Sequence, residues 1–318
     1  CEVKKLKHFE RDAVIETLKY SIKLASEKNK ISARFNKITE IIYESNALSD
    51  ENQDFIKVKD VQKAIQKKRI RNSKIEDRMN EMYRDGSYLI DVDGKKVGQI
   101  NGLAVMQVGE SVFGKPSRIT ASSYKGRYGI LNIEREVAHS GSIHDKGVLI
   151  LNGYIGNRYA KEDIPAMTTS ITFEQNYSGI DGDSASSTEL YVIISSIAGI
   201  PINQGIAVTG SMSQKGEIQP IGGVNEKIEG YYDVCSIKGL TGKQGVIIPI
   251  QNVKNLMLRD DIIKSVEEGQ FHIYAISNVE EGLQILTGLT IAKIDEKVKA
   301  AFKKFSENCD EKKSEKGE

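Results

Sequence analysis

The sequence has few cysteines and almost no net charge, and both shortages exclude whole classes of protein. Its three cysteines, Cys1, Cys235 and Cys309, are scattered without the spacing of a metal site. A small, odd number also gives no disulfide framework, so we expect a reducing compartment. The 45 basic and 44 acidic residues nearly balance. No overall attraction to nucleic acid or to a membrane surface is therefore expected.

Long hydrophobic runs are missing as well. The chain contains no stretch of about 18 apolar residues, and no signal peptide opens it. We therefore expect a cytoplasmic protein without a membrane-spanning helix. The chain begins at Cys1 rather than at a methionine and enters charged, helix-forming sequence at once. This start suggests a piece of a longer polypeptide.

Histidine is scarce, which weakens the case for a serine–histidine–aspartate triad. Of the four histidines, His8 lies in a helical stretch, His272 in an expected strand, and His139 and His144 flank a glycine-containing turn. The last two are candidates for a metal site or a catalytic base, although histidines in such loops are more often solvated or capping. No cluster has the spacing of metal ligands, so we expect no metal.

A complete nucleotide-binding loop is also missing. Residues 109–116 match the phosphate-binding loop pattern up to its last position, where Ser or Thr should offer a hydroxyl to magnesium. Pro116 has neither that hydroxyl nor an N–H, and no helix-forming stretch follows it. We interpret the segment as a hairpin connection. No cofactor is therefore expected in this chain.

The chain does contain a stretch, residues 179–187, in which a strand is expected to end and a helix to begin, with a serine near the start of that helix. Residues 169–173 alternate as in a half-buried strand, and apolar residues between 190 and 197 recur as in a helix. Ser184 would lie where free backbone N–H groups and the positive end of a helix dipole converge. Those are the donors that an acyl-transfer oxyanion needs.

A nucleophilic serine needs a base, and Lys227 is the candidate. It follows a glycine pair, Gly222-Gly223, at the start of a helix expected over residues 224–235. An amine accepts the serine proton only if burial lowers its pKa toward neutrality. Each residue alone has an ordinary explanation, because serine is common at helix caps and a lysine on an amphipathic helix is usually solvated.

Taken together, these motifs resemble the proteolytic domain of Lon-type AAA+ proteases. The resemblance rests on Asp-Gly-Asp-Ser-Ala-Ser at 181–186, Gly-Gly-Val-x-x-Lys-Ile at 222–228, the gap between them, and Thr-Gly-Ser at 209–211. It runs from about Gly86 to Gly288. Ser184 and Lys227 each have an ordinary explanation alone, but together with the other motifs they are consistent with one family.

The resemblance implies a role for four residues. Ser184 would be the nucleophile and Lys227 the base of a catalytic dyad. Thr209 would hold the lysine by a hydrogen bond. Asp183 matches a bacterial branch of the family that has Gly-Asp-Ser rather than Gly-Pro-Ser, and it would tune the lysine and shape the site.

The first 84 residues are expected to form a small all-α subdomain. Apolar residues recur at helical spacing over 9–28, 35–48 and 58–65, and a basic run at 67–71 leads into one connecting helix ending near Tyr83. The segment resembles the helical lid of an AAA+ ATPase. That resemblance makes Arg34 a candidate sensor-2 arginine for a nucleotide phosphate. A basic run this short is more often a solvated face than a nucleic-acid site.

From Asp85 onward the pattern changes to strands, glycine turns and helices, which indicates an α/β or α+β domain over residues 85–306. The resemblance implies that this is the proteolytic domain. The charged tail, residues 307–318, is expected to be disordered. Strands are expected at 88–92, 97–106, 117–122, 129–133, 169–173, 206–209, 245–249 and 272–275. Beyond the two helices of the motifs, further helices are expected at 146–161 and 279–286.

The resemblance implies a serine endopeptidase that cleaves unfolded or damaged proteins in a hexameric chamber, as the C-terminal part of an ATP-dependent protease. Two alternatives stay open. One is a Lon-like scaffold without proteolytic activity, as in some DNA-repair ATPases, although the presence of both Ser184 and Lys227 and the lack of basic excess argue against it. The other is a latent peptidase that needs an ATPase partner.

Overall fold

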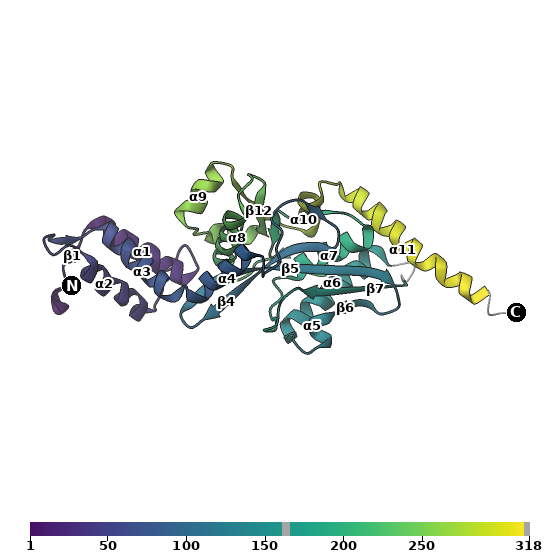
Figure 1. The fold of residues 1–318 in the computed structure, drawn as a ribbon, viewed down its shortest axis with the longest axis horizontal. Coiled ribbons are helices and arrows are strands. Elements are labelled where there is room, and N and C mark those ends of the chain that lie inside the picture. The colour runs from purple at the N-terminus through teal and green to yellow at the C-terminus, as the bar shows by residue number, and fades with distance from the viewer. Residues whose placement is uncertain (161–165, 315–318) are drawn as a thin grey trace. The chain divides into compact units, whose positions relative to one another are not determined.

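A computed structural model describes residues 1–160 and 166–314, with side chains up to Ser306. The chain forms two compact units (Figure 1). The first contains residues 1–79 together with 107–112 and 254–257, and the second contains the rest. The division falls inside helix α4 (Lys74–Asp85), a few residues before the boundary expected at Asp85.

The first unit is built from three helices that pack on one another: α1 (Arg11–Ala25), α2 (Phe35–Leu48) and α3 (Val58–Asn72). Their buried faces supply most of a small apolar core made of Ala13, Ile41, Ile56, Val61 and Ala64. All three helices were predicted from apolar spacing, and the structure confirms them.

Two details of this unit differ from the prediction. A short parallel pair, β1 (His8–Phe9) with β2 (Phe55–Ile56), joins the helices, because the extended residues before α1 and α3 bring apolar side chains into the core. The basic run 67–71 also belongs to α3 rather than to one connecting helix. The helix breaks at Ser73, whose hydroxyl lies 3.2 Å from the backbone oxygen of Ile70 and so competes with backbone pairing for that acceptor.

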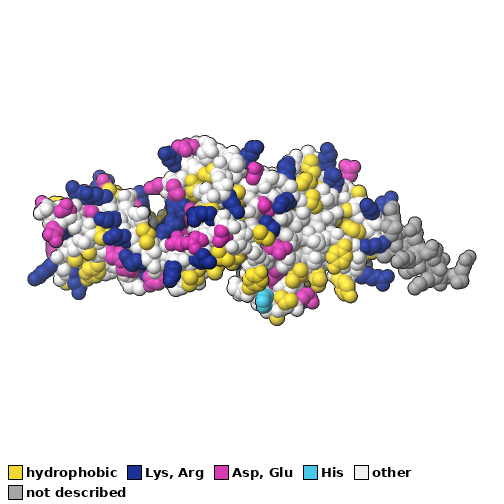
Figure 2. All heavy atoms as spheres, in the orientation of Figure 1, with side chains coloured by type: hydrophobic (Ala, Val, Ile, Leu, Met, Phe, Trp, Pro, Cys, Tyr) yellow, Lys and Arg dark blue, Asp and Glu magenta, His cyan; other side chains and the backbone are white. Residues whose placement is uncertain are grey.

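The basic run is neutralised within the same unit. Lys68 pairs with Glu40, and Arg71 pairs with Glu44. On the face drawn in Figure 2, basic and acidic side chains are interspersed and neither sign dominates. No helix in the described part of the chain is both long and apolar enough to span a membrane.

The second unit is organised around a mixed seven-stranded sheet with the order β13-β12-β9-β4-β5-β7-β6. The pairs β12–β13, β12–β9, β4–β9 and β6–β7 are parallel, while β5 and β7 are antiparallel. The strands are β4 (Gln99–Val108), β5 (Ser111–Lys125), β6 (Gly129–Asn132), β7 (Met167–Phe173), β9 (Ile206–Val208), β12 (Gln244–Pro249) and β13 (Phe271–Ile276).

Helices and short strand pairs complete this unit. The helices are α5 (Ile133–Glu136), α6 (Ser142–Tyr159), α7 (Ser186–Ala198), α8 (Val224–Lys238), α9 (Asp260–Glu267), α10 (Val279–Thr287) and α11 (Ile291–Ser314). The short pairs are β3 (Lys95–Lys96) with β8 (Ile202–Asn203), and β10 (Ser211–Met212) with β11 (Ile218–Gln219). A 3-10 turn covers Glu2–Lys4 in the first unit, and another covers Ile250–Asn255, which belongs partly to each unit.

Helix α7 lies at the centre of the second unit. Every residue of it except Ser196 and Ala198 is buried. A helix that is buried on nearly every face needs cover from several elements. It contacts α6, α10, α11 and β7 (Figure 1). The helix that follows Ser184 is therefore held by the core of the unit.

Most strands predicted from alternation are present, and the hairpin interpretation of residues 109–116 is confirmed. A tight turn at Gly109-Glu110 joins β4 to β5, and Lys115 and Pro116 lie within β5. The helix expected over 146–161 is also present as α6, although Lys161 lies outside the described residues.

The strand expected at 88–92 is wrong. Ile90 and Val92 are buried, which produces the alternation, but the backbone oxygens of Asp91 and Val92 accept from side-chain amides of Asn101 and Gln244. Those bonds replace a strand partner. Alternating burial alone is therefore insufficient evidence for a strand.

Helix α11 was not predicted, and it extends into the expected tail. Its backbone is helical through Ser314, whereas disorder was predicted from residue 307. Adding turns to an existing helix avoids the cost of nucleation, so a charged segment can continue one. Residues 315–318 of the expected tail lie outside the described residues.

Candidate active site

Ser184 lies in a tight turn between β7 and α7, two residues before the helix begins. Its carbonyl oxygen accepts from the N–H of Gly210 at 2.8 Å, and Ser186 N–H donates to Asp183 O at 3.0 Å. Gly182 adopts a φ of +91°, a left-handed conformation that favours glycine. These bonds fix the turn against the segment that follows β9.

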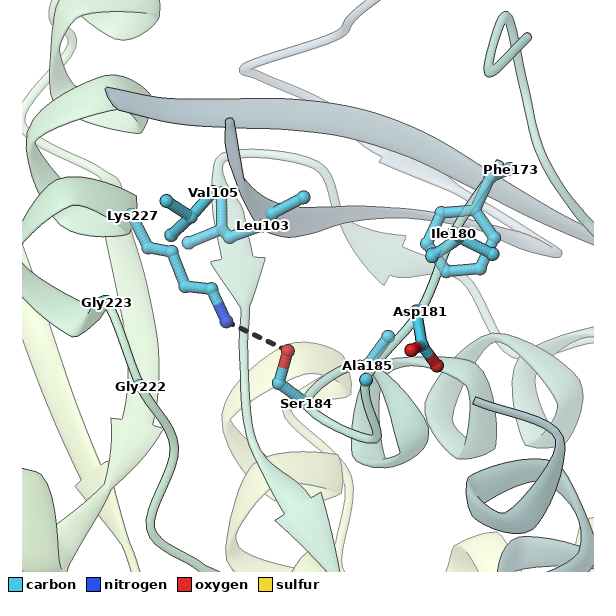
Figure 3. A pocket seen from close by; sticks show the side chains of 12 residues that line it. Leu103, Val105, Phe173, Ile180, Asp181, Ser184, Ala185, Gly222, Gly223 and Lys227 are labelled. Carbon is cyan, nitrogen blue, oxygen red and sulfur yellow. Dashed lines mark hydrogen bonds between the residues drawn. The ribbon is translucent and has the colours of Figure 1, made fainter. Parts of the chain in front are cut away.

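Lys227 approaches Ser184 from the first turn of α8. Its Nζ atom lies 2.9 Å from Ser184 Oγ and 3.0 Å from Thr209 Oγ1 (Figure 3). The Thr209 hydroxyl donates to the carbonyl oxygen of Ser184 at 3.3 Å. Three residues that are far apart in the sequence are thus in mutual contact.

The environment of Lys227 opposes a positive charge. The residue is 3% exposed. Its burial lowers the pKa to about 8, although the negative charges of Asp183 and Glu226 raise it in part. In the described chain no carboxylate lies within ion-pair distance of its Nζ atom. The neutral amine is therefore accessible near physiological pH.

Asp183 is held by neighbours other than the lysine. Its Oδ2 atom accepts from Ser211 Oγ at 2.8 Å, and the same hydroxyl lies 3.0 Å from Gln219 Oε1. The carboxylate affects Lys227 through its charge at a distance. The sequence had singled out Asp183 but gave no sign of these partners.

A pocket of about 280 Å³ opens beside the two side chains. In Figure 3, Leu103 and Val105 of β4 lie near Lys227, whereas Phe173 and Ile180 lie on the opposite side, beyond Ser184. Its lining is mostly apolar, and it consists of Leu103, Ala104, Val105, Phe173, Ile180, Asp181, Gly182, Ser184, Ala185, Gly222, Gly223 and Lys227. Leu103 and Phe173 were not expected here, because only the fold brings β4 and β7 to the serine.

The other sequence candidates do not line this pocket. Arg34 is exposed at the start of α2 in the first unit, and its sensor role stays a prediction. Among the histidines, His144 is buried against Glu189 rather than against Ser184, with Nε2 3.0 Å from Oε1. Within the described residues, no group of three or more His, Cys, Asp and Glu side chains could hold a metal ion. Cys309 lies outside the described side chains.

Comparison with known proteins accounts for nearly the whole described chain. Residues 69–288 match the Lon protease (S16) C-terminal proteolytic domain. The chain belongs to the Lon protease family. Residues 8–71 match the AAA+ ATPase lid domain of archaeal LonB, so a helical lid precedes the Lon-type serine peptidase domain.

Relatives occur in both bacteria and archaea. A Lon protease homolog of Escherichia coli (strain K12) is 42% identical over 227 residues, which are 71% of this chain and 39% of that protein. The archaeal Lon protease of Archaeoglobus fulgidus is 30% identical over 287 residues, which are 88% of this chain and 42% of that protein. The chain thus spans less than half of either relative. Assignment to a bacterial branch stays a prediction.

Proposed function

We propose that Ser184 and Lys227 form the catalytic dyad of a serine endopeptidase. The observation that carries the proposal is the 2.9 Å contact between Lys227 Nζ and Ser184 Oγ inside a buried site that lowers the lysine pKa to about 8. At pH 7 roughly a tenth of such lysines are neutral, whereas an exposed lysine is almost never so. A neutral amine at hydrogen-bond distance can accept the serine proton.

Peptide cleavage then follows from the positions of the side chains. Ser184 Oγ attacks the peptide carbonyl carbon while its proton passes to Lys227 Nζ. The lysine returns that proton to the leaving amine, and water releases the acyl group from the serine. Thr209 contacts the same Nζ atom. It would keep the amine aimed at the serine through both proton transfers.

Backbone N–H groups of the serine turn would stabilise the tetrahedral oxyanion. The N–H groups of Ser186 and Ser187 already donate to Asp183 O and Gly210 O. The oxyanion donors are therefore expected in the turn before Ser186, where the N–H groups of Ser184 and Ala185 are the candidates. Losing one such donor typically costs about a hundredfold or more in rate.

We further propose unfolded or damaged proteins as substrates and a hexameric chamber as the assembly. Both follow from the family. ATP with Mg would act in a longer protein, where Arg34 would contact a phosphate of the nucleotide. An apolar pocket beside the serine suits a hydrophobic side chain of an extended, unfolded chain.

The test is cleavage of a fluorogenic unfolded protein by the wild type, Ser184→Ala and Lys227→Met, with and without ATP. Lys215→Met, at an exposed lysine, is the matched control. We expect activity in the wild type and the control, and at least a thousandfold loss in the two dyad variants. Equal activity in Ser184→Ala would refute the nucleophile. Activity in none of the four proteins would favour a scaffold or a latent peptidase.

A further inference from the structure

A buried polar cluster lies directly behind one wall of the pocket. At its centre is His144 in the first turn of α6, which is 1% exposed. Its Nε2 atom lies 3.0 Å from Oε1 of Glu189, a fully buried residue of α7. The ring also packs edge-on against Phe173, with ring centroids 5.6 Å apart. Phe173 lines the pocket (Figure 3).

Hydrogen-bond directions locate the protons of this pair. Ser140 donates its hydroxyl proton to Oδ1 of Asp145 at 2.6 Å, because an ionised carboxylate only accepts. Ser140 Oγ must then accept from Nδ1–H of His144, 2.9 Å away. The amide nitrogen of Asn132 is 3.5 Å from Nδ1, beyond an ordinary hydrogen bond. A second proton lies between Nε2 and Glu189, since a bare ring nitrogen and a carboxylate would repel each other.

Several acidic groups face the ring. Glu189 approaches from α7, Glu134 from α5 and Asp145 from α6 itself, while Asp181 accepts from the main-chain N–H of His144. Burial alone disfavours the charged ring, but the bond to Glu189 and the surrounding carboxylates outweigh it and raise the pKa of His144. One oxygen of Glu189 and one of Glu134 are buried without a partner. Losing the ring proton would leave uncompensated negative charge in an apolar layer.

The same helix end holds the segment that carries the nucleophile. Asp181 Oδ1 accepts from His144 N–H at 3.3 Å, and Gly141 N–H donates to Ile180 O at 2.8 Å. Gly147, one turn along α6, lies against Asp183. On the other side of Ser184 in the chain, Glu189 belongs to the first turn of α7, and it links that helix to His144 of α6. A shift of α6 relative to α7 would therefore displace Ser184.

We propose that His144 and Glu189 are positioning residues of the active site, which keep Ser184 within reach of Lys227 only while their pair retains its proton. The inference rests on the proposed dyad. It adds an alkaline limit to activity, because the rate falls when the pair loses its proton. A nucleophile displaced by about 1 Å commonly loses about a hundredfold in rate.

The decisive measurement is kcat/KM against pH for the wild type, Glu189→Gln and His272→Gln. Glutamine keeps the size of Glu189 and a hydrogen bond to the ring, but it lacks the charge that retains the proton. We expect the alkaline limb of Glu189→Gln to lie at least about one pH unit lower than that of the wild type. At a pH above both limbs, its kcat/KM should therefore be roughly tenfold lower. The control variant His272→Gln should leave the alkaline limb unchanged. His272 lies in β13, and its Nε2 atom is 2.9 Å from Gly242 O. Coincident alkaline limbs for Glu189→Gln and the wild type would overturn the inference.

Two further measurements test the inference even if Glu189→Gln does not fold. Asp145→Asn removes a half-buried charge that acts through Ser140, and it should shift the alkaline limb in the same direction by less. In ¹⁵N-histidine spectra of Ser184→Ala, both ring nitrogens of His144 should carry protons at pH 7. A neutral ring at pH 7, or an unmoved limb in Asp145→Asn, contradicts the inference. Because the spectra need no catalysis, failure here is distinguishable from retained activity in Ser184→Ala, which refutes the dyad itself.

Discussion

At the scale of single residues, Lys227 shows how a site can work against stability. Burial disfavours its ammonium form, and the negative charges of Asp183 and Glu226 compensate only in part. Its pKa is about 8 in the folded chain, against 10.5 for an unperturbed lysine. Folding therefore expels a proton at any pH between these values. Below pH 8 the folded state bears the full cost of holding the charge.

Lys227→Met is accordingly expected to stabilise the second unit at pH 7, by about 1–3 kcal/mol in the free energy of unfolding. The unfolded chain binds more protons than the folded chain between pH 8 and 10.5, so wild-type stability rises with pH through that window. The gain from the substitution should shrink correspondingly. Denaturant unfolding at pH 7 and pH 10 measures both effects.

The exposed Lys215 again provides the comparison, because Lys215→Met should change stability by no more than about 0.5 kcal/mol at either pH. A Lys227→Met variant that is less stable than the wild type at pH 7 would contradict the account. It would mean that the two hydrogen bonds to Nζ outweigh the burial of the charge.

At the scale of elements, the position of α8 depends on a close contact with β5. Gly230 in α8 faces the backbone of Gly114 in β5, and a Cβ atom at position 230 would collide with that backbone. The helix that carries Lys227 therefore lies closer to the sheet than any larger residue would allow. Neither glycine was singled out by the sequence, because the contact joins elements distant in the chain.

Gly230→Ala should lower the free energy of unfolding by about 2 kcal/mol or more and reduce peptidase activity, since α8 must move away from β5. Gly156→Ala in α6 is the matched control, because a Cβ there meets nothing within 4 Å. That control should be neutral or more stable by up to about 1 kcal/mol. Thermal and denaturant unfolding of both variants provide the comparison, and equal effects would exclude the contact as the cause.

Periodicity located elements well where burial follows one face. The helices of the first unit and the strand β7 were predicted for that reason, whereas β12 and β13 were predicted as buried apolar runs. It failed at residues 88–92, where side-chain amides satisfy the backbone in place of a strand partner. It also missed α11, whose apolar residues are spaced among many lysines and glutamates.

At the scale of the whole molecule, α11 completes the core around the serine helix. Ile294, Val298 and Phe302 are buried in the same core as α7. Asp295 ties the helix to α6 by accepting from Arg158 at 2.8 and 3.0 Å. A segment near the end of the described chain thus supports the helix that begins beside Ser184.

A chain that ends after Thr290 should therefore lose several kcal/mol of stability in the second unit, at about 1.5–3 kcal/mol for each buried apolar side chain removed. A chain that ends after Ser306 keeps these three residues and should unfold close to the wild-type temperature. Calorimetry of the two truncations tests this prediction. A shared unfolding temperature would show that α11 contributes nothing to the core.

The sequence by itself determined the family, the helical lid, the order of most elements and the identity of the serine, lysine and threonine that meet. Those features are carried by short motifs and by local periodicity, which a single chain displays directly. Only the tertiary structure decided that Lys227 is buried enough to lose its proton, that Ser211 holds Asp183, and that His144 pairs with Glu189 behind the pocket. Burial and pairing depend on which distant segments come together, and no local pattern records that.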